Sequence, residues 1–506
     1  MVTFRTPGVY IEEASYGPRP IEGVGTSTAA FVGVSERGPT RPQLVSSLAE
    51  YWRWFGGDAG ADAYLPYAAR GFFENGGRRL YVARVVSRAA NCAEAAFGPH
   101  FTVRALGPGS WGRRIFARIE DASHRPGSFR LRLAYYSTEP TGDPLDWFNS
   151  TPQAPVPDLA EDFDNLALDP AVADYWQKRL AESALAGLVC ADAAPADASP
   201  EHGFHRLSVG GGDGASALDA ADYEGSDAPP HSEVQGLAAL SDVAYRDIAV
   251  VAVPGAPFDV VRAVVRHCEA IRHRFAIVDA PSGLPVGFDP RSAIADSSYA
   301  ALYTPWLIVA GLADSRQRRT VPPSGHVAGI YARIDSERGV HKAPANEVVQ
   351  GVLGVTDAID DHVQDVINPL GINALRNFSG RGLRVWGART LSTDPQWKYV
   401  NLRRLCIYLE RSIDEGTRWV VFEPNSEDVW KRVATLVQEF LYKVWRSGAL
   451  QGSVPEQAFF VRCDRSTITQ SDVDNGRLIC EIGVAPVRPA EFVIIRIGQR
   501  TSEAGR

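Results

Sequence analysis

The sequence predicts a multidomain α+β protein in which α/β and β-rich parts follow one another along the chain. Residues 248–278 read as strand, helix and strand, which is the pattern of a parallel βαβ unit. Residues 101–137 instead alternate apolar and polar side chains over short runs, as antiparallel strands do. The chain has 506 residues, more than one core normally holds, so we expect roughly two to four domains.

The N-terminal region after residue 22 predicts a compact unit of strands and helices. We expect a strand over residues 28–34 and a helix that begins after Ser47, where Glu50 completes a capping box. A second helix is predicted over 65–75, because two glycines follow it, and a strand over 80–86.

The region after 101–137 has a different composition. Residues 140–232 are rich in Pro, Asp, Ala and Gly, and we expect order only over 163–188 and 205–209. The glycine-rich run 210–214 predicts a flexible connection.

The middle of the chain returns to alternating strands and helices. A helix is expected over 258–271, between strands over 248–253 and 275–278. A strand over 304–309 and a helix over 325–333 continue this alternation.

The C-terminal part predicts two long helices and several strands. An amphipathic helix is expected over 400–413, a strand over 419–422 and a long helix from Ser426. Strands are then expected over 459–463 and 478–484.

Composition excludes several classes of function. The net charge of −8 disfavours a nucleic-acid binder, because phosphate contacts need a basic surface. The longest apolar run is far shorter than the roughly 20 residues of a membrane helix, and the first residues do not resemble a secretory signal. The six cysteines are scattered without CxxC spacing, which predicts free thiols in a reducing compartment such as the cytoplasm.

Ser27 lies in the segment GTSTAA, which resembles the nucleophile segment of a subtilisin-type protease. Neither an aspartate nor a histidine precedes Ser27, and a strand rather than a helix is expected after it. The run 210–214 lacks the Lys-Ser/Thr of a phosphate-binding loop. We therefore predict no catalytic residue and no cofactor.

The acidic cluster Asp360, Asp361, His362 and Asp365 permits a metal interpretation on a helical face. The sequence offers no second ligand cluster to complete it, so a solvated helix face is favoured. His202 and His205 lie in a loop-like region and support no metal site either. We predict that the protein binds no metal.

Short apolar strands at both ends of the chain are the most informative feature. Each lies on a tether that contains prolines, and an exposed apolar strand invites pairing with another chain. Each strand can instead fold back into the sheet of its own subunit. The candidate strand-exchange residues are Val9, Tyr10, Ile11, Glu12, Glu13, Phe492, Val493, Ile494, Ile495, Arg496 and Ile497.

Five segments together resemble the contractile tail sheath proteins of phage tails, pyocins and contractile injection systems. They are TPGVYIEEASYGPRPIEGVGTSTAAFVGVSERGP (6–39), GPGSWGRRI (107–115), PPSGHVAGIYARIDSERGVHKAPANE (322–347), INALRNFSGRGLRVWGARTLS (372–392) and WKYVNLRRLCIYLERSIDEGTRWVVFEPNSEDVWKRV (397–433). The resemblance is close over the first hundred residues and over about 320–500, and looser between them.

The resemblance implies a structural subunit that polymerises as stacked hexameric rings around an inner tube. Contraction of this sheath drives the tube through a target membrane, while terminal arms lend strands to neighbouring subunits. The implied partners are other copies of the chain, the inner tube protein, and baseplate and cap proteins, with no nucleic acid and no direct membrane insertion. Assembly is expected in the bacterial cytoplasm, with the product a phage tail or a tail-like particle that is released or attached to a membrane.

The resemblance also implies how the domains are arranged. An α/β sheath core is expected from N- and C-terminal parts, with a β-rich domain and an α/β middle domain of subtilisin-like fold inserted. The expected parts are an arm (1–22), the first core part (23–90), a β-rich outer domain (91–232), the middle domain (233–369), the C-terminal core (370–486) and a second arm (487–506).

Lys443 and Arg446 near the end of the long helix are candidates for contact with the inner tube. Cations in a last helical turn also interact with the helix dipole, which is the alternative explanation. Two alternatives to the sheath function remain: a non-contracting baseplate or collar relative, and an α/β hydrolase.

Overall fold

The computed structural model describes residues 20–60, 63–192, 195, 198–214, 217–225, 235–285 and 287–491. The chain divides into two compact units. Unit 1 combines Met1–Val24 with Leu405–Arg506, and unit 2 is Gly25–Arg404. Both terminal segments therefore belong to one unit, and the longer middle segment forms the other.

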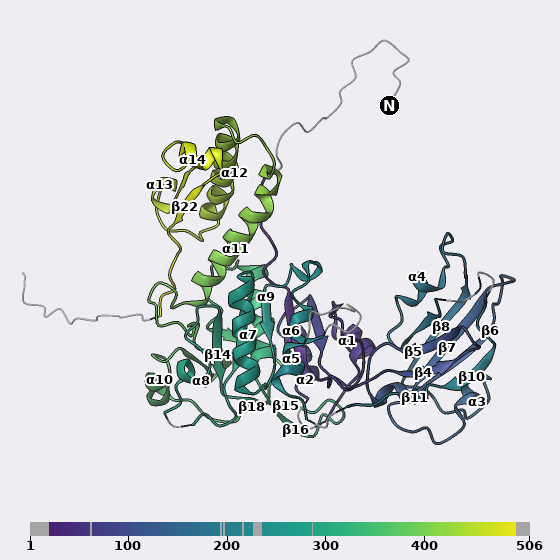
Figure 1. The fold of residues 1–506 in the computed structure, drawn as a ribbon. Coiled ribbons are helices and arrows are strands. Elements are labelled where there is room, and N and C mark those ends of the chain that lie inside the picture. The colour runs from purple at the N-terminus through teal and green to yellow at the C-terminus, as the bar shows by residue number, and fades with distance from the viewer. Residues whose placement is uncertain are drawn as a thin grey trace, which may run out of the picture. The chain divides into compact units, whose positions relative to one another are not determined.

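Unit 2 is built around a mixed sheet of nine strands (Figure 1). In spatial order these are β17 (Glu347–Val348), β20 (Gly382–Val385), β19 (Ile372–Phe378), β14 (Ala300–Thr304), β13 (Phe275–Asp279), β12 (Val250–Ala252), β1 (Ala29–Gly33), β3 (Leu80–Arg84) and β2 (Gln43–Val45). The strands from β19 to β3 pair in parallel, and the outer strands pair antiparallel.

The period-2 alternation of β1 assigns its side chains to the two faces of this sheet. Ala30 and Val32 join a core cluster that includes Val260 and Val264 of α7 (Phe258–Ile271). Phe31 lies between them in sequence, and its ring contacts Phe72 edge to face at 5.6 Å. All five residues of β1 are buried, as expected for a central parallel strand.

Glycines allow a close crossing of α2 (Leu65–Glu74) and α9 (Ser324–Glu337). A Cβ at Gly325 would lie 2.4 Å from the Ala68 Cα, and one at Gly329 would lie 2.4 Å from the Phe72 carbonyl oxygen. The backbones are therefore in direct contact at this crossing, and larger residues would separate the two helices.

The other helices of unit 2 are mostly short. They are α1 (Leu48–Phe55), η1 (Ser110–Arg114), α3 (Pro144–Phe148), α4 (Trp176–Leu180), α5 (Ala220–Glu224), α6 (Gly236–Ala239), η3 (Val243–Tyr245), α8 (Pro290–Ala293) and α10 (Asp361–Ile367). A small sheet of β16 (Arg318–Val321), β15 (Leu307–Ala310) and β18 (Gly354–Val355) completes the part of unit 2 around the large sheet.

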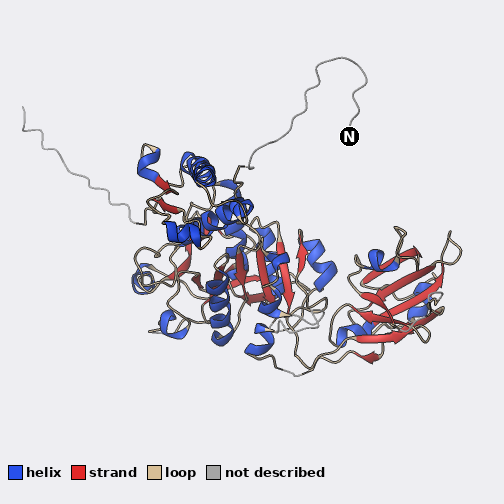
Figure 2. Ribbon diagram, turned by 45° about the horizontal axis from the view of Figure 1, so that its top comes forward, coloured by secondary structure: helices blue, strands red, loops and turns tan. Residues whose placement is uncertain are grey.

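Two four-stranded antiparallel sheets form a sandwich within unit 2 (Figure 2). One has the order β10 (Gly203–Arg206), β6 (Ile115–Asp121), β7 (Phe129–Tyr135) and β8 (Leu159–Leu166). The other has β11 (Val209–Gly210), β4 (Ala93–Ala96), β5 (Phe101–Ala105) and β9 (Ala186–Cys190). Both contribute to one apolar core around the buried Trp111.

Unit 1 contains two long helices and a small sheet. Helix α11 (Val400–Thr417) begins at the end of unit 2 and continues in unit 1. It is followed by η4 (Arg418–Val420), α12 (Glu427–Arg446), α13 (Pro455–Ala458), β21 (Phe459–Arg462), α14 (Gln470–Asp474) and β22 (Glu481–Val484). The predicted apolar stripe of α12 is buried, as expected: Val433, Leu436, Val437, Phe440, Leu441 and Val444.

The mixed α/β architecture with several sheets confirms the predicted fold class at this level, but some elements differ from the prediction. The strand predicted over 304–309 is wrong, because Pro305 separates β14 and β15, which lie in different sheets. The strand predicted over 419–422 is also wrong: its first residues form η4, and Val421 and Phe422 are exposed. Apolar character alone does not make a strand where no partner strand is available.

The described residues of the segment 140–232 are more ordered than predicted. Six helices and strands lie outside the two expected ranges or extend them. Four of these are strands, which form because residues 93–135 supply antiparallel pairing partners. The glycine run is also anchored: the Gly212 N–H donates to Asn91 Oδ1 at 2.7 Å, and the Gly211 N–H donates to the Cys92 carbonyl at 3.1 Å. The six-part domain division stays a prediction, since the large sheet includes strands from three of its parts.

Candidate functional site

Both predicted exchange strands, Val9–Glu13 and Phe492–Ile497, lie outside the described residues. The structure does describe residues 20–24 and 485–491, which are the described residues nearest to these strands in sequence. It also describes a sheet of two strands in the same unit. These features make up the candidate site for contact with other subunits.

The segment after the N-terminal strand lies against α11. Ile21 is 4% exposed, and a Cβ at Gly416 would lie 2.6 Å from its Cγ1. The Val24 N–H donates to Ser412 Oγ at 3.1 Å, and a Cβ at Gly23 would overlap the Tyr408 hydroxyl at 2.1 Å. The chain is therefore fixed on α11 directly after the predicted arm.

The segment before the C-terminal strand is fixed by backbone hydrogen bonds. The Gln451 N–H donates to the Ala485 carbonyl at 2.7 Å, and the Val487 N–H donates to the Ala449 carbonyl at 3.1 Å. The Gln451 side-chain amide also donates to the Pro486 carbonyl at 2.9 Å. Unit 1 thus holds the chain after the N-terminal predicted strand and before the C-terminal one.

Strands β21 and β22 form an antiparallel sheet that has only these two strands within the described part of the chain. Phe459 pairs with Val484, and Arg462 pairs with Glu481. Phe460 is 48% exposed, which is unusual for a large aromatic side chain on a sheet. A two-stranded ribbon is marginally stable, and its outward N–H and C=O groups are available to further strands.

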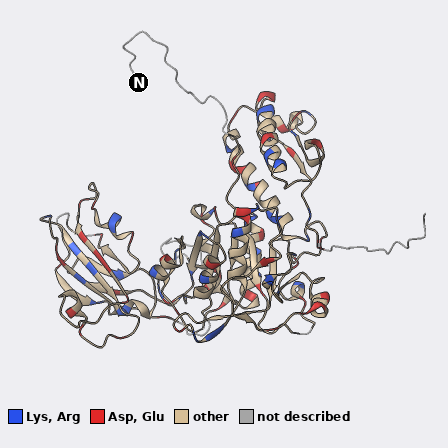
Figure 3. Ribbon diagram, turned by 180° about the vertical axis from the view of Figure 1, so that it is seen from behind, with Lys and Arg blue, Asp and Glu red and all other residues tan. Residues whose placement is uncertain are grey.

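The two candidate inner-tube residues lie where the sequence predicts them, in the last turn of α12. Lys443 and Arg446 are exposed, and neither forms an ion pair with a described residue. Figure 3 shows that basic and acidic residues are interspersed along the ribbon. Glu439, one turn before Lys443 on α12, is also exposed. Their position is compatible both with a partner surface and with stabilisation of the helix C-terminus.

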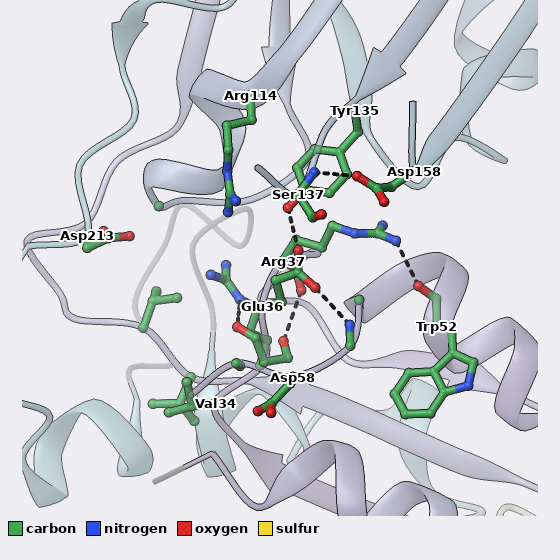
Figure 4. A pocket seen from close by; sticks show the side chains of 18 of the residues that line it. Val34, Glu36, Arg37, Trp52, Asp58, Arg114, Tyr135, Ser137, Asp158 and Asp213 are labelled. Atoms are coloured by element: carbon green, nitrogen blue, oxygen red, sulfur yellow. Dashed lines mark hydrogen bonds between the residues drawn. The ribbon is translucent and has the colours of Figure 1, made fainter. Parts of the chain in front are cut away.

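Unit 2 contains a cavity of about 890 Å³ where the sandwich meets the large sheet (Figure 4). Glu36 and Arg37 follow β1, and Tyr135 lies at the end of β7. The Tyr135 hydroxyl donates to Glu36 Oε1 at 2.5 Å, and the other Glu36 oxygen accepts from the Gly57 N–H at 2.8 Å. Burial raises the pKa of Tyr135 well above its usual range.

Two buried arginines of this cavity bind backbone carbonyls. Arg37 donates to the carbonyls of Trp52 at 2.8 Å and Arg53 at 2.5 Å, at the C-terminal end of α1. Arg84 donates to the carbonyl of Pro108 at 2.7 Å, and burial lowers its pKa to about 10. The bonds from Tyr135 to Glu36 and from Arg84 to Pro108 thus join the sandwich to the sheet, so these polar side chains have partners within the protein.

Asp279 is a buried polar residue that the sequence analysis did not select. It ends β13 and accepts from the N–H and hydroxyl of Ser324, both at 2.7 Å, and from the Gly255 N–H at 3.1 Å. Burial raises its pKa to about 6, although these hydrogen bonds oppose the rise. The carboxylate caps the start of α9, so its position is explained by helix capping rather than by catalysis.

The residues weighed for catalysis or metal binding are not assembled into a site. Asp360 caps α10 by accepting from the Val363 N–H at 2.9 Å, and Asp361 forms an ion pair with Arg376 at 2.8 Å. Among the described residues there is no group of three or more His, Cys, Asp or Glu side chains that could hold a metal ion. None of the described helices has the length and apolar character that a membrane crossing requires.

Comparison with protein families gives two adjacent matches that together cover more than half of the chain. The model for the phage tail sheath protein central domain matches residues 219–391. The model for the phage tail sheath C-terminal domain matches residues 392–500. These ranges include most of the large sheet and all of the described C-terminal residues of unit 1, 405–491.

Curated relatives are similar over part of their length. A putative prophage major tail sheath protein of Pseudomonas aeruginosa is 26% identical over 185 residues, which are 35% of this chain and 46% of that protein. The tail sheath protein of Escherichia phage P2 is 25% identical over 183 residues, 35% of this chain and 44% of the relative. The matched region thus spans less than half the length of these relatives.

Solved structures are similar over nearly the whole chain. The anti-feeding prophage helical sheath in the contracted state gives a TM-score of 0.59 at 26% identity, covering 98% of this chain and 100% of the other. The contracted sheath complex of the extracellular contractile injection system PVC gives 0.58 at 23% identity, covering 99% of both chains.

The fold and these matches define a structural protein of a contractile tail or tail-like particle, not an enzyme. The chain belongs to the phage tail sheath family. It is a sheath protein of the kind found in contractile tail-like injection systems.

Proposed function

We propose that the chain polymerises as stacked hexameric rings around an inner tube and contracts to drive that tube through a target membrane. The observation that carries this proposal is the two-stranded sheet β21–β22, in the same unit that holds the chain after the N-terminal predicted strand and before the C-terminal one. A subunit with open sheet edges and two terminal strands has what strand exchange with neighbours requires.

Val9–Glu13 and Phe492–Ile497 each supply a strand to the β21–β22 sheet of a neighbouring subunit in this proposal. Each backbone hydrogen bond formed contributes a net ~0.5–1.5 kcal/mol, and each buried apolar side chain adds ~1.5–3 kcal/mol. The exposed Phe460 then gains apolar neighbours, and the outward backbone groups of the sheet gain partners.

The partners of the assembled particle are further copies of this chain, an inner tube protein, and baseplate and cap proteins. Lys443 and Arg446 face the inner tube, where exposed cations on α12 contact acidic side chains. Assembly takes place in the bacterial cytoplasm, and the product is a phage tail or a tail-like particle, released or attached to a membrane. Neither nucleic acid nor direct membrane insertion is part of the proposal.

The finer domain assignments belong to the same proposal. Residues 23–90 and 370–486 form the sheath core, the sandwich within 91–232 lies in an outer domain, and 233–369 form a middle domain of subtilisin-like fold. The parallel order of β12, β13 and β14 supports an α/β character for this middle domain.

A non-contracting baseplate or collar relative is the second candidate. It is favoured by one observation: a similar chain is present in the anti-feeding prophage baseplate, with a TM-score of 0.56 and 26% identity over 99% of this chain. A baseplate component would form a single ring, whereas a sheath subunit forms long tubes.

Electron microscopy of the purified protein tests the proposal. We expect tubes with six-fold symmetry from the intact chain, and folded subunits without tubes after deletion of residues 1–13. Ile11→Pro should also abolish tubes, because proline removes a backbone donor from the strand, whereas Ser15→Pro in the tether should preserve them. Tubes formed by the deleted chain would refute the arm assignment, and single rings from the intact chain would favour the baseplate alternative.

A further inference from the structure

Two cysteines lie side by side where the β21–β22 sheet ends. Cys463 directly follows β21, and Cys480 directly precedes β22. The register pairs Arg462 with Glu481, so Cys463 and Cys480 occupy the next opposite positions if the register continues. Opposite residues of antiparallel strands have Cα atoms ~4.5–5.5 Å apart, within the ~4.4–6.8 Å that a disulfide spans.

The surroundings of the two thiols differ. Cys463 is 6% exposed and lies in an apolar cluster with Trp430 and Ile468, while Cys480 packs against this cluster and is half-buried. The Cys463 thiol is hydrogen-bonded to Cys480, and this bond lowers the pKa of Cys480. The same hydrogen bond raises the pKa of Cys463, and burial raises it further. Cys480 is therefore the more accessible thiol and the one that an oxidant from solution reaches first.

We propose that Cys463 and Cys480 are an oxidisable dithiol that forms a disulfide across the end of the β21–β22 sheet. With a hydroperoxide as the oxidant, the Cys480 thiolate attacks one peroxide oxygen, the O–O bond breaks, and the departing oxygen takes up a proton to leave as water or an alcohol. The sulfur of Cys463 then attacks the resulting sulfenic acid, the S–S bond forms, and the Cys463 proton leaves with the hydroxyl as water. Two electrons pass from the thiol pair to the peroxide.

The bond would tie together the two strand ends around the segment 464–479, which contains α14. The ends of β21 and β22 could then no longer separate when the sheet is pulled. The mechanical benefit rests on the proposed function, in which this sheet carries the arms of neighbouring subunits. In a reducing compartment the pair stays as thiols, and it forms the disulfide when the protein meets an oxidant.

A thiol count on the unassembled full chain tests the inference. Of six cysteines, we expect maleimide labelling of the denatured chain to detect two fewer after treatment with stoichiometric hydrogen peroxide than before it. Mass spectrometry should show a linked peptide that joins 463 to 480, and dithiothreitol should restore both thiols. A wild-type chain that loses thiols to peroxide without this linked peptide would overturn the inference, as would one that loses none.

Matched variants separate pairing from general oxidation. In C463S we expect Cys480 to persist as a sulfenic acid that dimedone labels, and C480S should protect Cys463 from peroxide. C190S is the control, since Cys190 is a half-exposed thiol on β9, and it should leave the linked peptide unchanged. Equal oxidation of Cys463 in C480S and in the wild type would contradict the order of the two steps, while circular dichroism checks that each variant is folded. This experiment needs no tubes, so its failure and the failure of the sheath proposal are separate outcomes.

Discussion

Replacement of Asp335 by asparagine tests how strongly a buried ion pair stabilises unit 2. The side chains of Arg404 and Asp335 are 4% and 1% exposed, with two N–H···O contacts of 2.9 and 2.5 Å. Arg404 also donates to the Thr26 carbonyl at 3.0 Å, and its guanidinium lies 4.7 Å from the centre of the Tyr331 ring. Burial alone would lower the pKa of Arg404, but the charge and hydrogen bonds of Asp335, together with Tyr331 and Tyr303, more than offset it, and the pKa is raised.

The expected cost follows from what Asp335→Asn leaves behind. The asparagine keeps the size of the side chain and one acceptor oxygen, but the charge of Arg404 then stays buried without a counter-charge. Removal of one partner from a buried pair costs ~3–5 kcal/mol, whereas the loss of an exposed pair costs about 0–1 kcal/mol. We therefore expect Asp335→Asn to lower the free energy of unfolding of unit 2 by about 3–5 kcal/mol.

Hydrogen–deuterium exchange of peptides from α9, measured on the full chain, reports this change locally. A drop of ~3 kcal/mol or more should raise the exchange rate of the slowest α9 amides by over a hundredfold. Glu139→Gln is the matched control, because Glu139 forms a two-contact pair with Arg206 that is exposed (64% and 39%). It should change exchange in its own sandwich by less than about tenfold.

The double variant Asp335→Leu with Arg404→Met tests whether the cost of Asp335→Asn arises from the unpaired charge of Arg404 or from lost packing. If the cost of Asp335→Asn arises from an unpaired charge, the double variant should be more stable than Asp335→Asn despite two replacements. An exchange rate in Asp335→Asn that differs from the wild-type rate by less than tenfold would refute the reasoning. So would a double variant that is destabilised by as much as the Asp335→Leu and Arg404→Met single variants added together.

Three further predictions concern the start and the crossing of α9. Gly329→Ala should lower the free energy of unfolding by about 1–3 kcal/mol in a thermal melt, because its Cβ would press against the Phe72 carbonyl. The pKa of Asp279 is raised to about 6 in the folded protein. The protonated carboxyl therefore contributes stability at low pH, and this contribution is lost as pH rises through about 4 to 6. Asp279→Asn should remove this pH dependence from unfolding curves measured across that range. Burial lowers the pKa of His326 to about 3 in the folded protein, so the stability that the neutral imidazole contributes is lost as pH falls below about 6.5. His326→Met should remove this loss of stability and leave the pH dependence that arises from Asp279 unchanged.

The sequence pattern predicted an element correctly where the residues within that element determine its structure. Helix α7 begins and ends where its apolar stripe predicts, and α12 begins after Ser426 with acidic residues in its first turn. The capping box at Ser47 was half right. Ser47 accepts from the Glu50 N–H, but the Glu50 carboxylate accepts from Ser46 instead of Ser47. Such features depend on neighbours within a few residues, which the sequence contains.

The sequence pattern did not predict elements and contacts that depend on residues far away in the sequence. Residues 159–166 form a strand because β7 offers its edge, and nothing within the segment itself reveals that edge. Cys463 and Cys480 meet through the register of β21 and β22, although their spacing matches no cysteine motif. Asp279 gave no signal either, because its partner Ser324 lies 45 positions away.

The attachment of both arms to one unit limits where a sheath of such subunits can store energy. In the proposed assembly, each exchanged strand begins in one unit 1 and ends on the sheet of another, since residues 21–24 and 485–487 are held within unit 1. Separating one such strand would break several backbone hydrogen bonds at ~0.5–1.5 kcal/mol each and expose apolar side chains at ~1.5–3 kcal/mol each. A contraction that kept these pairings would avoid that cost at every subunit. The free energy that drives contraction would then come from contacts that change while the strand pairing persists, and the covalent crossings between the units at 24–25 and 404–405 would transmit it.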